Sequence, residues 1–391
     1  MAVAKVEWES VERAAVEQVL REVRRVRAEH PDERIYAAMF HVFYGDGEDI
    51  YWPCLSVGTE ESLKTVEARY LERDPDDDVS GLRFSGADLP YMVEATEAEM
   101  AVAEGVNEYG LSLGGEDAWD EVYDQFLEVF PRAARKARKA AIDESLVGEE
   151  FIVVALDEAM ELVPACLTRE QLERHFPELV AGQRDEQRIL ALPEAERVQA
   201  LLDISFRRIE GSPLWWERTD PLLFREGAAA VPGLVAVLEG RAEGEPWTAA
   251  RLAAGVNHAT PELIAALDRV LDDEQAEEAA KGWAASALCA LGRMDLLAGR
   301  IGSLPEATIS QGLSHPFGPF RDKGNHGPLD YRPLEAVLEA HPEFDEKLLN
   351  CSGGTCEIDE AEVAEAERGT ASKWKFIRDH AEDVLERYRA R

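Results

Sequence analysis

The stretch RIYAAMFHVFYGDGEDIYWPCLSV, residues 34–57, decides the fold of the first half of the chain. Its two runs, 34–44 and 49–57, are rich in aromatic and β-branched residues, which favour strands. The intervening Gly-Asp-Gly-Glu is typical of a hairpin turn. We therefore expect two paired strands here, with Pro53 indicating a sheet edge or a bulge, because proline cannot donate a ladder hydrogen bond.

Helical patterns surround this hairpin. Apolar residues recur at helical spacing over residues 11–26, and a second helical pattern opens with a capping residue and acids over residues 59–71. The later run EFIVVAL, residues 150–156, is typical of a buried strand. A hairpin, a later strand and flanking helices predict an α+β N-terminal domain over residues 1–180.

The charge of the chain is most uneven between Phe84 and Pro131. This segment holds twelve acidic residues and no Lys or Arg, while apolar residues recur at helical spacing from Trp119 to Phe130. We expect one face of that helix to be buried in the core and the other to be acidic. The acidic face would attract a basic partner. The predicted partner-binding acids are Glu116, Asp117, Asp120, Glu121 and Asp124.

The second half of the chain has no strand pattern and contains an internal repeat. PGLVAVLE, residues 232–239, matches PELIAALD, residues 261–268, and Leu-Leu-Ala at 296–298 repeats part of it. A period near 30 residues with two helical patterns per unit is typical of an α-solenoid. The units resemble HEAT-like repeats over residues 195–305, so we expect an all-α HEAT-like solenoid in a second domain, residues 187–391.

A long loop interrupts this helical half. HPFGPFRDKGNHGPLDYRP, residues 315–333, contains three Gly and four Pro and predicts irregular structure before the C-terminal capping helices. It is the best local candidate for a site, because it carries hydrogen-bond donors in an acidic protein, but the favoured interpretation is a packed connector between the solenoid and its cap. The donors are Arg321, Lys323, His326 and Tyr331.

The boundary between the two domains is expected in the small, polar stretch AGQRDEQ, residues 181–187.

Metal-binding patterns are incomplete. The alternating aspartates at 74–78 resemble the start of a calcium loop, but Val79 stands where that loop needs Gly. Cys351 and Cys356 could bind zinc, but a structural zinc site needs four ligands and the second pair is missing. Five scattered cysteines fit reduced thiols, and we expect no metal and no cofactor.

The sequence also lacks common catalytic signatures. It has no phosphate-binding P-loop, no Gly-x-Gly-x-x-Gly turn after a strand, no nucleophile elbow and no recognisable cysteine-protease signature. Paired carboxylates carry no weight, because with 79 acidic residues any two fall near each other. Catalytic residues are therefore not predicted.

Overall charge bounds the partners and the location. The chain has 42 basic and 79 acidic residues and a net charge of −37, which repels nucleic acids and anionic membranes. No apolar stretch of about 18 residues is free of charge, and acids in the first twenty residues oppose a signal peptide. We expect a cytoplasmic protein with a protein partner, no nucleic-acid partner and no membrane partner.

Several segments carry a family resemblance. They are Ile35-Tyr36-Ala37-Ala38 with its strand, Thr59-Glu60-Glu61 after the second strand, the segment 82–91, and the Phe151 strand. Through them, residues 33–178 resemble a bacterial family catalogued as domain of unknown function 4303. Its members usually have Trp where Phe84 stands and often another at Leu89, so apolar bulk is kept while a Trp-lined pocket loses support. The resemblance implies the fold and no catalytic residue.

The resemblance also implies a class of partner. Such domains are similar to small soluble proteins of bacterial toxin neighbourhoods, where acidic immunity proteins block basic toxins directly. We therefore expect a non-enzymatic cytosolic protein-interaction module, with an immunity-type inhibitor of a basic bacterial toxin as its specific form. The alternative is an enzyme of unrecognised class with a site at the interdomain cleft, where pockets tend to form.

Overall fold

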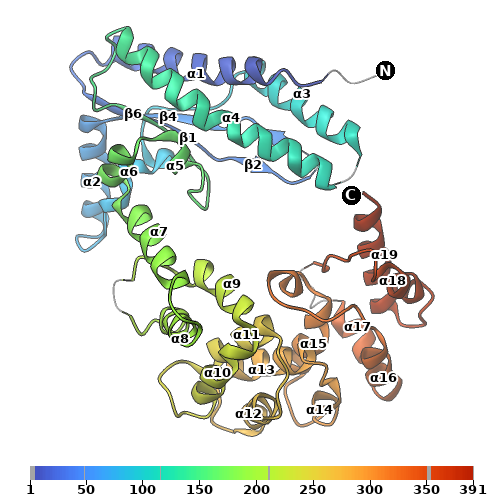
Figure 1. Cartoon of the computed structure of the whole chain (residues 1–391). Coiled ribbons are helices and arrows are strands. Elements are labelled where there is room, and N and C mark those ends of the chain that lie inside the picture. The colour runs from blue at the N-terminus through green and yellow to red at the C-terminus, as the bar shows by residue number, and fades with distance from the viewer. Residues whose placement is uncertain (1–4, 48, 115, 210–211, 350–353, 391) are drawn as a thin grey trace. The chain divides into compact units, whose positions relative to one another are not determined.

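The computed structural model describes residues 5–47, 49–114, 116–209, 212–349 and 354–390. The chain divides into two compact units, Met1–Pro177 with Ala390–Arg391, and Glu178–Arg389. The first unit contains a small mixed sheet with helices, and the second is helical (Figure 1). Each unit is described by itself below.

A four-stranded mixed sheet is the centre of the first unit. Its strand order is β5-β4-β1-β6; β4 pairs antiparallel with both of its neighbours, and β1 pairs parallel with β6. All seven residues of β1 are buried, as expected of an inner strand. The strands are β1 (Ile35–His41), β4 (Cys54–Thr59), β5 (Met92–Val93) and β6 (Ile152–Leu156).

The predicted hairpin is divided into two ladders. β1 and β4 pair in the sheet, while β2 (Tyr44–Gly45) and β3 (Ile50–Tyr51) form a separate two-stranded ribbon at the turn. Pro53 lies between β3 and β4, and β4 is an inner strand. The missing N–H of this proline therefore falls in the gap between two ladders, and not on a sheet edge.

Two long helices cover the sheet. α1 and α4 lie side by side (Figure 1), and the ring of Phe130 on α4 packs 5.1 Å from Phe40 on β1 and 5.5 Å from Trp52. α2 and α3 begin with capping boxes at Thr59 and Thr96. The helices of this unit are α1 (Trp8–Glu29), α2 (Glu60–Arg73), α3 (Glu97–Leu113), α4 (Glu116–Asp143), α5 (Val163–Cys166) and α6 (Arg169–His175), with short 3-10 helices η1 (Ser80–Phe84) and η2 (Gly86–Asp88).

The described residues of the second unit contain helices and a single isolated bridge, between Ile301 and Leu304. The α-helices are α7 (Pro177–Leu190), α8 (Glu194–Ser205), α9 (Trp216–Glu226), α10 (Val231–Leu238), α11 (Pro246–Val256), α12 (Pro261–Asp272), α13 (Glu278–Ala290), α14 (Met294–Ala298), α15 (Glu306–Ser314), α16 (Arg332–Ala340), α17 (Phe344–Leu348), α18 (Val363–Thr370) and α19 (Lys375–Ala390). The 3-10 helices are η3 (Gly227–Ala230), η4 (His315–Phe317) and η5 (Pro319–Lys323).

These helices pack in pairs. α8 contacts α9, α10 contacts α11, α12 contacts α13 and α14 contacts α15, and α13 packs between α11 and α15. The pairs share one continuous core that extends from Ile189 to Leu385. The helix faces approach closely because their side chains are small, as Ala249, Ala253 and Ala284 illustrate, all fully buried.

The division between the units differs from the expected one. Helix α7 covers residues 181–187, where a linker is predicted, and the division falls after Pro177. Gln, Arg, Asp and Glu are common on exposed helix faces, so a polar stretch does not distinguish a linker from a surface helix.

One segment, Trp216–Leu238, is long and apolar enough to cross a membrane by length and composition alone. It comprises α9, η3 and α10, and 39% of its most apolar window is buried inside the unit. A single such helix is weak evidence, because the core helices of globular proteins pass the same test.

Candidate functional site

Helix α4 separates an apolar stripe from an acidic one. Trp119, Phe126 and Phe130 are buried against the sheet side, while Asp120, Glu121 and Asp124 are exposed. The side chains of the other two predicted acids, Glu116 and Asp117, lie outside the described part of the structure. Three of the five predicted partner-binding acids are therefore placed together on the surface of one helix.

Helix α3 adds more exposed carboxylates beside them. It packs against α4, and the indole N–H of Trp119 donates a 2.7 Å hydrogen bond to Asn107 Oδ1, which fixes the contact. Glu99 of α3 is buried in its capping box and is ion-paired with Arg21, so it does not contribute to the surface. We call the exposed acids of the two helices the acidic helix pair: Glu97, Glu104, Glu108, Asp120, Glu121, Asp124 and Glu128.

Basic residues begin one turn after this surface. Arg132 and Lys136, in the second half of α4, both pair with Glu12 of α1. Arg132 also lies 3.9 Å from Glu128, at the border of the acidic helix pair. Glu12 of α1 thus partly neutralises the bases in the second half of α4. The first half of α4 therefore keeps its negative potential.

The β2–β3 ribbon, which carries two tyrosines, packs against α4. Gly45 of the ribbon lies directly on α4: a Cβ atom there would be 2.7 Å from Cε2 of Tyr123 and 3.0 Å from Cη2 of Trp119. Tyr44 and Tyr51 pair across the ribbon with ring centroids 5.4 Å apart, and they remain 50% and 44% exposed. Exposed tyrosines are typical of protein interfaces.

No sequence pattern singles out these tyrosines. They are part of the aromatic run that predicts the hairpin, and aromatic residues in a strand are usually buried. The signal that could have found them is their position on either side of a Gly-Asp-Gly turn, where a ribbon extends beyond the sheet.

In the loop 315–333, Arg321 is buried and makes its polar contacts within the chain. The side chain is 5% exposed, forms an ion pair with Glu362, and donates to the carbonyl oxygens of Glu357 at 2.8 Å and Gly327 at 3.0 Å. Glu362 also accepts a 2.6 Å hydrogen bond from the backbone N–H of Leu329. The donors of Arg321 are used within the chain, so its predicted role toward a partner is corrected.

Tyr331 is also internal and has no exposed surface. Its hydroxyl lies 2.7 Å from Nδ1 of His380, whose Nε2 lies 2.8 Å from the carbonyl oxygen of Phe317. A carbonyl oxygen only accepts, so Nε2 carries the proton and Nδ1 accepts from Tyr331. Burial lowers the pKa of His380 to about 4, and the ring is neutral near pH 7.

Cys356 belongs to the same cluster. Its Sγ lies 3.7 Å from Nε2 of His380, and burial raises the pKa of its thiol to about 12. The predicted partner cysteine, Cys351, lies outside the described residues. Within the described part of the chain, no group of three His, Cys, Asp or Glu side chains could hold a metal ion.

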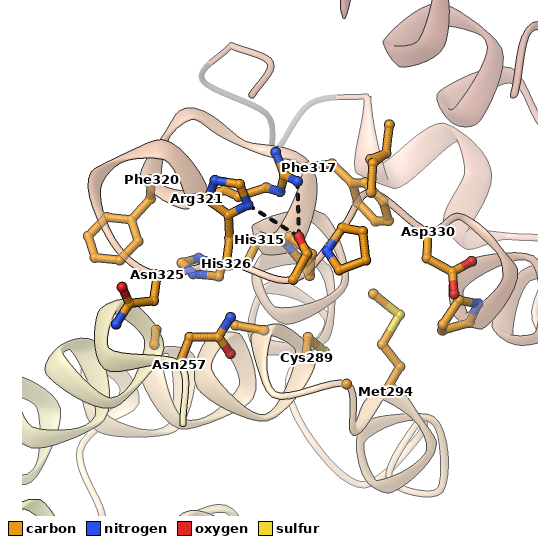
Figure 2. Close-up of a pocket in the computed structure, with 18 residues that line it drawn as sticks. Asn257, Cys289, Met294, His315, Phe317, Phe320, Arg321, Asn325, His326 and Asp330 are labelled. Atoms are coloured by element: carbon orange, nitrogen blue, oxygen red, sulfur yellow. Dashed lines mark hydrogen bonds between the residues drawn. The ribbon is translucent and has the colours of Figure 1, made fainter. Parts of the chain in front are cut away.

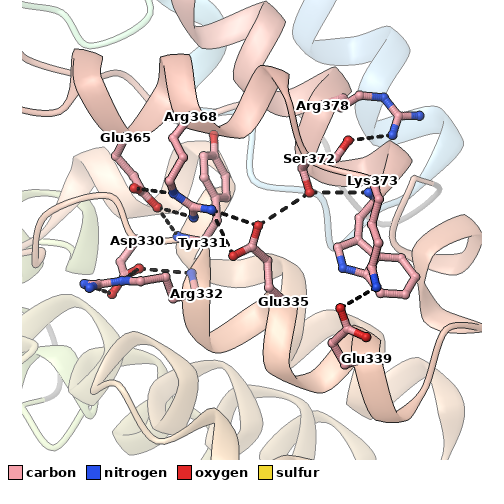
Figure 3. Close-up of polar contacts among 11 residues, drawn as sticks. Asp330, Tyr331, Arg332, Glu335, Glu339, Glu365, Arg368, Ser372, Lys373 and Arg378 are labelled. Atoms are coloured by element: carbon pink, nitrogen blue, oxygen red, sulfur yellow. Dashed lines mark hydrogen bonds and ion pairs between the residues drawn. The ribbon is translucent and has the colours of Figure 1, made fainter.

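The backbone of Tyr331 is held as firmly as its side chain (Figure 3). Its N–H donates a 2.8 Å hydrogen bond to Glu365, which is ion-paired with Arg368 at 2.7 Å. Arg368 in turn pairs with Glu335 at 2.9 Å and so joins α18 to α16. These contacts agree with the favoured interpretation of the loop as a packed connector.

The remaining predicted donors of the loop, Lys323 and His326, are exposed. His326 Nδ1 donates to the carbonyl oxygen of Gly327 at 3.2 Å, and the loop encloses a small pocket of about 250 Å³ (Figure 2). His315 also lines the pocket, and burial lowers its pKa to about 4. Of the four predicted donors, two can reach a partner and two cannot.

Three hydrogen bonds donated by Asn325 hold the loop against the helices. The backbone N–H of Asn325 donates to the carbonyl oxygen of Gly255 at 2.8 Å, and its Nδ2 donates to those of Phe224 at 2.6 Å and Val256 at 3.0 Å. The last two oxygens lie in the final turns of α9 and α11, and the Phe224 oxygen also accepts from the backbone N–H of Gly227. Gly324 permits this approach, because a Cβ there would lie 2.5 Å from the Gly255 oxygen.

Comparisons with known proteins bear mainly on the first unit. No curated protein matches the chain. Among solved structures, an engineered protein from the Northeast Structural Genomics Consortium is 14% identical and covers 74% of this chain and 80% of its own, with a TM-score of 0.22. A family match is found over residues 13–174 and does not extend into the helical second unit. As the sequence predicts, the first half of the chain matches the family described as Domain of unknown function (DUF4303).

Proposed function

We propose that this protein is a non-enzymatic protein-interaction module that binds a basic protein through the acidic helix pair. The observation that carries this proposal is the exposure of Asp120, Glu121 and Asp124 together on α4, the helix against which the ribbon with the exposed tyrosines 44 and 51 packs. Residues 84–131 contain no basic side chain that could neutralise these acids locally.

The two kinds of side chain have different tasks in this proposal. Exposed carboxylates attract a basic partner from a distance and raise the association rate, an effect that salt weakens. The tyrosine pair gives rigid, amphipathic contact area, which slows dissociation.

We infer, more specifically, that the protein acts in the cytoplasm as an immunity-type inhibitor that blocks a basic bacterial toxin. The support is the match of residues 13–174 to the family and the sign of the charge, together with the analogy to acidic immunity proteins.

We also infer that the helical unit is a HEAT-like solenoid. The repeated segments 232–239, 261–268 and 296–298 fall on α10, α12 and α14, which are the first helices of successive pairs. The second helices α11, α13 and α15 pack in a row, as stacked repeats would.

Charge reversal tests the main proposal. The triple variant Asp120→Lys, Glu121→Lys, Asp124→Lys should lose the partner that the wild-type chain captures from its native host, with affinity reduced about tenfold or more. A matched control, Glu72→Lys, Asp76→Lys, Asp77→Lys, changes the net charge equally at exposed positions of α2 and the following turn. The control should keep most of its binding.

The captured partner is then titrated at low and moderate ionic strength. We expect weaker binding at higher salt, chiefly through slower association. Binding that survives the triple reversal, or falls equally in the control, would show that the acidic helix pair is not the interface.

A further inference from the structure

A second cavity of the helical unit is large and aromatic. Its volume is about 800 Å³, within the range of sites that bind drug-sized ligands. Helices α9, α11 and α13 and the 3-10 helix η5 contribute walls to it. Its aromatic lining consists of Phe206, Trp216, Phe224, Trp247, Trp283 and Phe320.

Three of the eight tryptophans of the chain line this one cavity. Trp216, Trp247 and Trp283 lie on α9, α11 and α13, so successive helix pairs each contribute one indole. Trp283 packs against Phe320 with ring centroids 5.1 Å apart, and Trp216 is 39% exposed. Within the described residues, the indole N–H groups of Trp216 and Trp283 make no hydrogen bond.

A buried ion pair lines the cavity among these rings. Asp220 is 3% exposed, accepts a 3.0 Å hydrogen bond from Ser205, and lies 2.6 Å from Nη1 of Arg251. The guanidinium of Arg251 lies 5.1 Å from the ring centre of Trp216. Its other N–H groups have no acceptor in the described part of the chain, so the cavity has hydrogen-bond donors whose charge Asp220 already balances.

The charges at the cavity disfavour an ionic ligand. Glu245 precedes α11 and Glu217 lies in the first turn of α9, so carboxylates of the chain already occupy both positive helix ends. A phosphate therefore gains nothing at these helix ends, and the lining as a whole offers it no net positive charge, because its acids and bases are equal in number. A cationic ligand meets the opposite obstacle, because Arg251 already covers Trp216 and the lining also includes the bases Arg207 and Lys323.

An uncharged ligand with compact apolar rings and carbonyl acceptors fits this lining. We infer that the cavity binds a proline-rich segment of a partner protein in the polyproline II conformation. Proline rings pack on indole faces, and the backbone carbonyls of this conformation have no internal hydrogen bonds, so they accept from indole and guanidinium N–H groups. The segment is already extended and loses little entropy on binding. This inference goes beyond the proposed function, since it concerns another unit and another partner chemistry.

The test uses the full chain and a blocked octaproline peptide, with binding followed by tryptophan fluorescence and calorimetry. A blocked Gly-Ser octapeptide and adenosine monophosphate serve as controls for an extended chain without rings and for a planar anion. We expect saturable binding of octaproline and none of either control.

Two neighbouring tryptophans provide a matched pair of variants. Trp216→Ala removes an indole of the cavity and should weaken octaproline binding about tenfold or more. Trp215→Ala removes a 67% exposed indole that does not line the cavity and should change affinity by about twofold at most. Both positions are partly or largely exposed, so thermal unfolding should show that both variants fold.

Three results would overturn the inference: no saturable binding of octaproline, equal loss in the Trp215 and Trp216 variants, or binding of adenosine monophosphate in place of the peptide. The triple reversal of Asp120, Glu121 and Asp124 should bind octaproline as the wild type does. That variant separates this inference from the proposed function, because each can fail while the other holds.

Discussion

At the scale of single residues, His380 has the most completely described surroundings. Its ring is 4% exposed and contacts Tyr331, Phe317 and Cys356. The charged groups that act on it are Asp383, which favours protonation, and Arg321 and Arg387, which oppose it. Burial has the largest effect, so the neutral ring is the form that the folded chain holds.

This burial predicts a pH dependence of stability. The pKa of His380 is about 4 in the folded chain against 6.5 when unperturbed, and His315 is lowered equally by burial. Between pH 6.5 and 4 the unfolded chain binds more protons, so the free energy of unfolding should fall as the pH falls through this window. We expect a loss of about 1–3 kcal/mol for each of these histidines. Urea titrations of the wild type at several pH values would measure it.

His380→Gln supplies the control for that experiment. The variant lowers stability at every pH because the hydrogen bonds to Tyr331 and Phe317 change, but its slope between pH 6.5 and 4 should be shallower. An unchanged slope would show that His380 does not titrate in this window.

Residue-scale burial explains which site residues the sequence could not place. Lys323 and His326 are exposed, whereas Arg321 and Tyr331 of the same loop are enclosed. The partner of Arg321 is Glu362, 41 residues away, and such a distant contact leaves no local pattern. Composition identifies a Gly- and Pro-rich loop but cannot tell which of its polar residues point inward.

At the scale of elements, the Arg321–Glu362 pair joins η5 to the turn before α18. Arg321→Met should leave the buried carboxylate of Glu362 uncompensated and lower the stability of the second unit by about 3–5 kcal/mol. Lys323→Met removes an exposed charge two residues further along the chain and should change stability by about 0.5 kcal/mol or less. Thermal and urea unfolding compare the two, and equal losses would contradict the internal role of Arg321.

Elements with a strong local pattern agree with the sequence analysis. The aromatic run gives β1, the EFIVVAL run gives β6, and the periodic apolar residues give α1 and α4. The ribbon could not be separated from the sheet, because the same strand-favouring composition continues through both. β5, with two residues, is too short for any alternation to appear. Helix α4 also continues through Pro131 into the basic segment, so two charge regions belong to one element.

At the scale of the whole molecule, the net charge of −37 sets the response to salt. Repulsion among like charges destabilises a compact chain, and raising the salt from about 0.01 to 0.15 M shortens the Debye length from about 30 to 8 Å. We expect the midpoint of thermal unfolding to rise by a few degrees, which corresponds to a gain of order 1 kcal/mol in the free energy of unfolding.

The variant with Lys at positions 72, 76 and 77 refines this measurement. Each acid-to-lysine change adds two charges, so its net charge is −31 and its midpoint should rise less with sodium chloride. A midpoint that falls with salt would mean that the ion pairs of the surface outweigh the general repulsion.

Charge and repeats are local or periodic in the sequence, which is why the acidic face of α4 and the helical second half could be predicted, while helix α3 beside α4 was not. The aromatic cavity was missed although it has a comparable signal: Trp216, Trp247 and Trp283 follow one another at about the repeat spacing. The expected division at residues 181–187 had no such support, because a polar surface helix and a linker share the same composition.

The hydrogen bonds of Asn325 to the ends of α9 and α11 limit the order in which the chain can fold during synthesis. These bonds, to the carbonyl oxygens of Val256 and Phe224, span 69 and 101 residues. Helices α9 and α11 therefore leave the ribosome well before the residue that satisfies their ends has been made. Until then, water must hydrate the Val256 carbonyl, the Phe224 carbonyl keeps only the hydrogen bond from the Gly227 N–H, and the nascent helix pairs stay open at that edge. The last step in the maturation of the helical unit is thus the closing of one loop over helices formed much earlier.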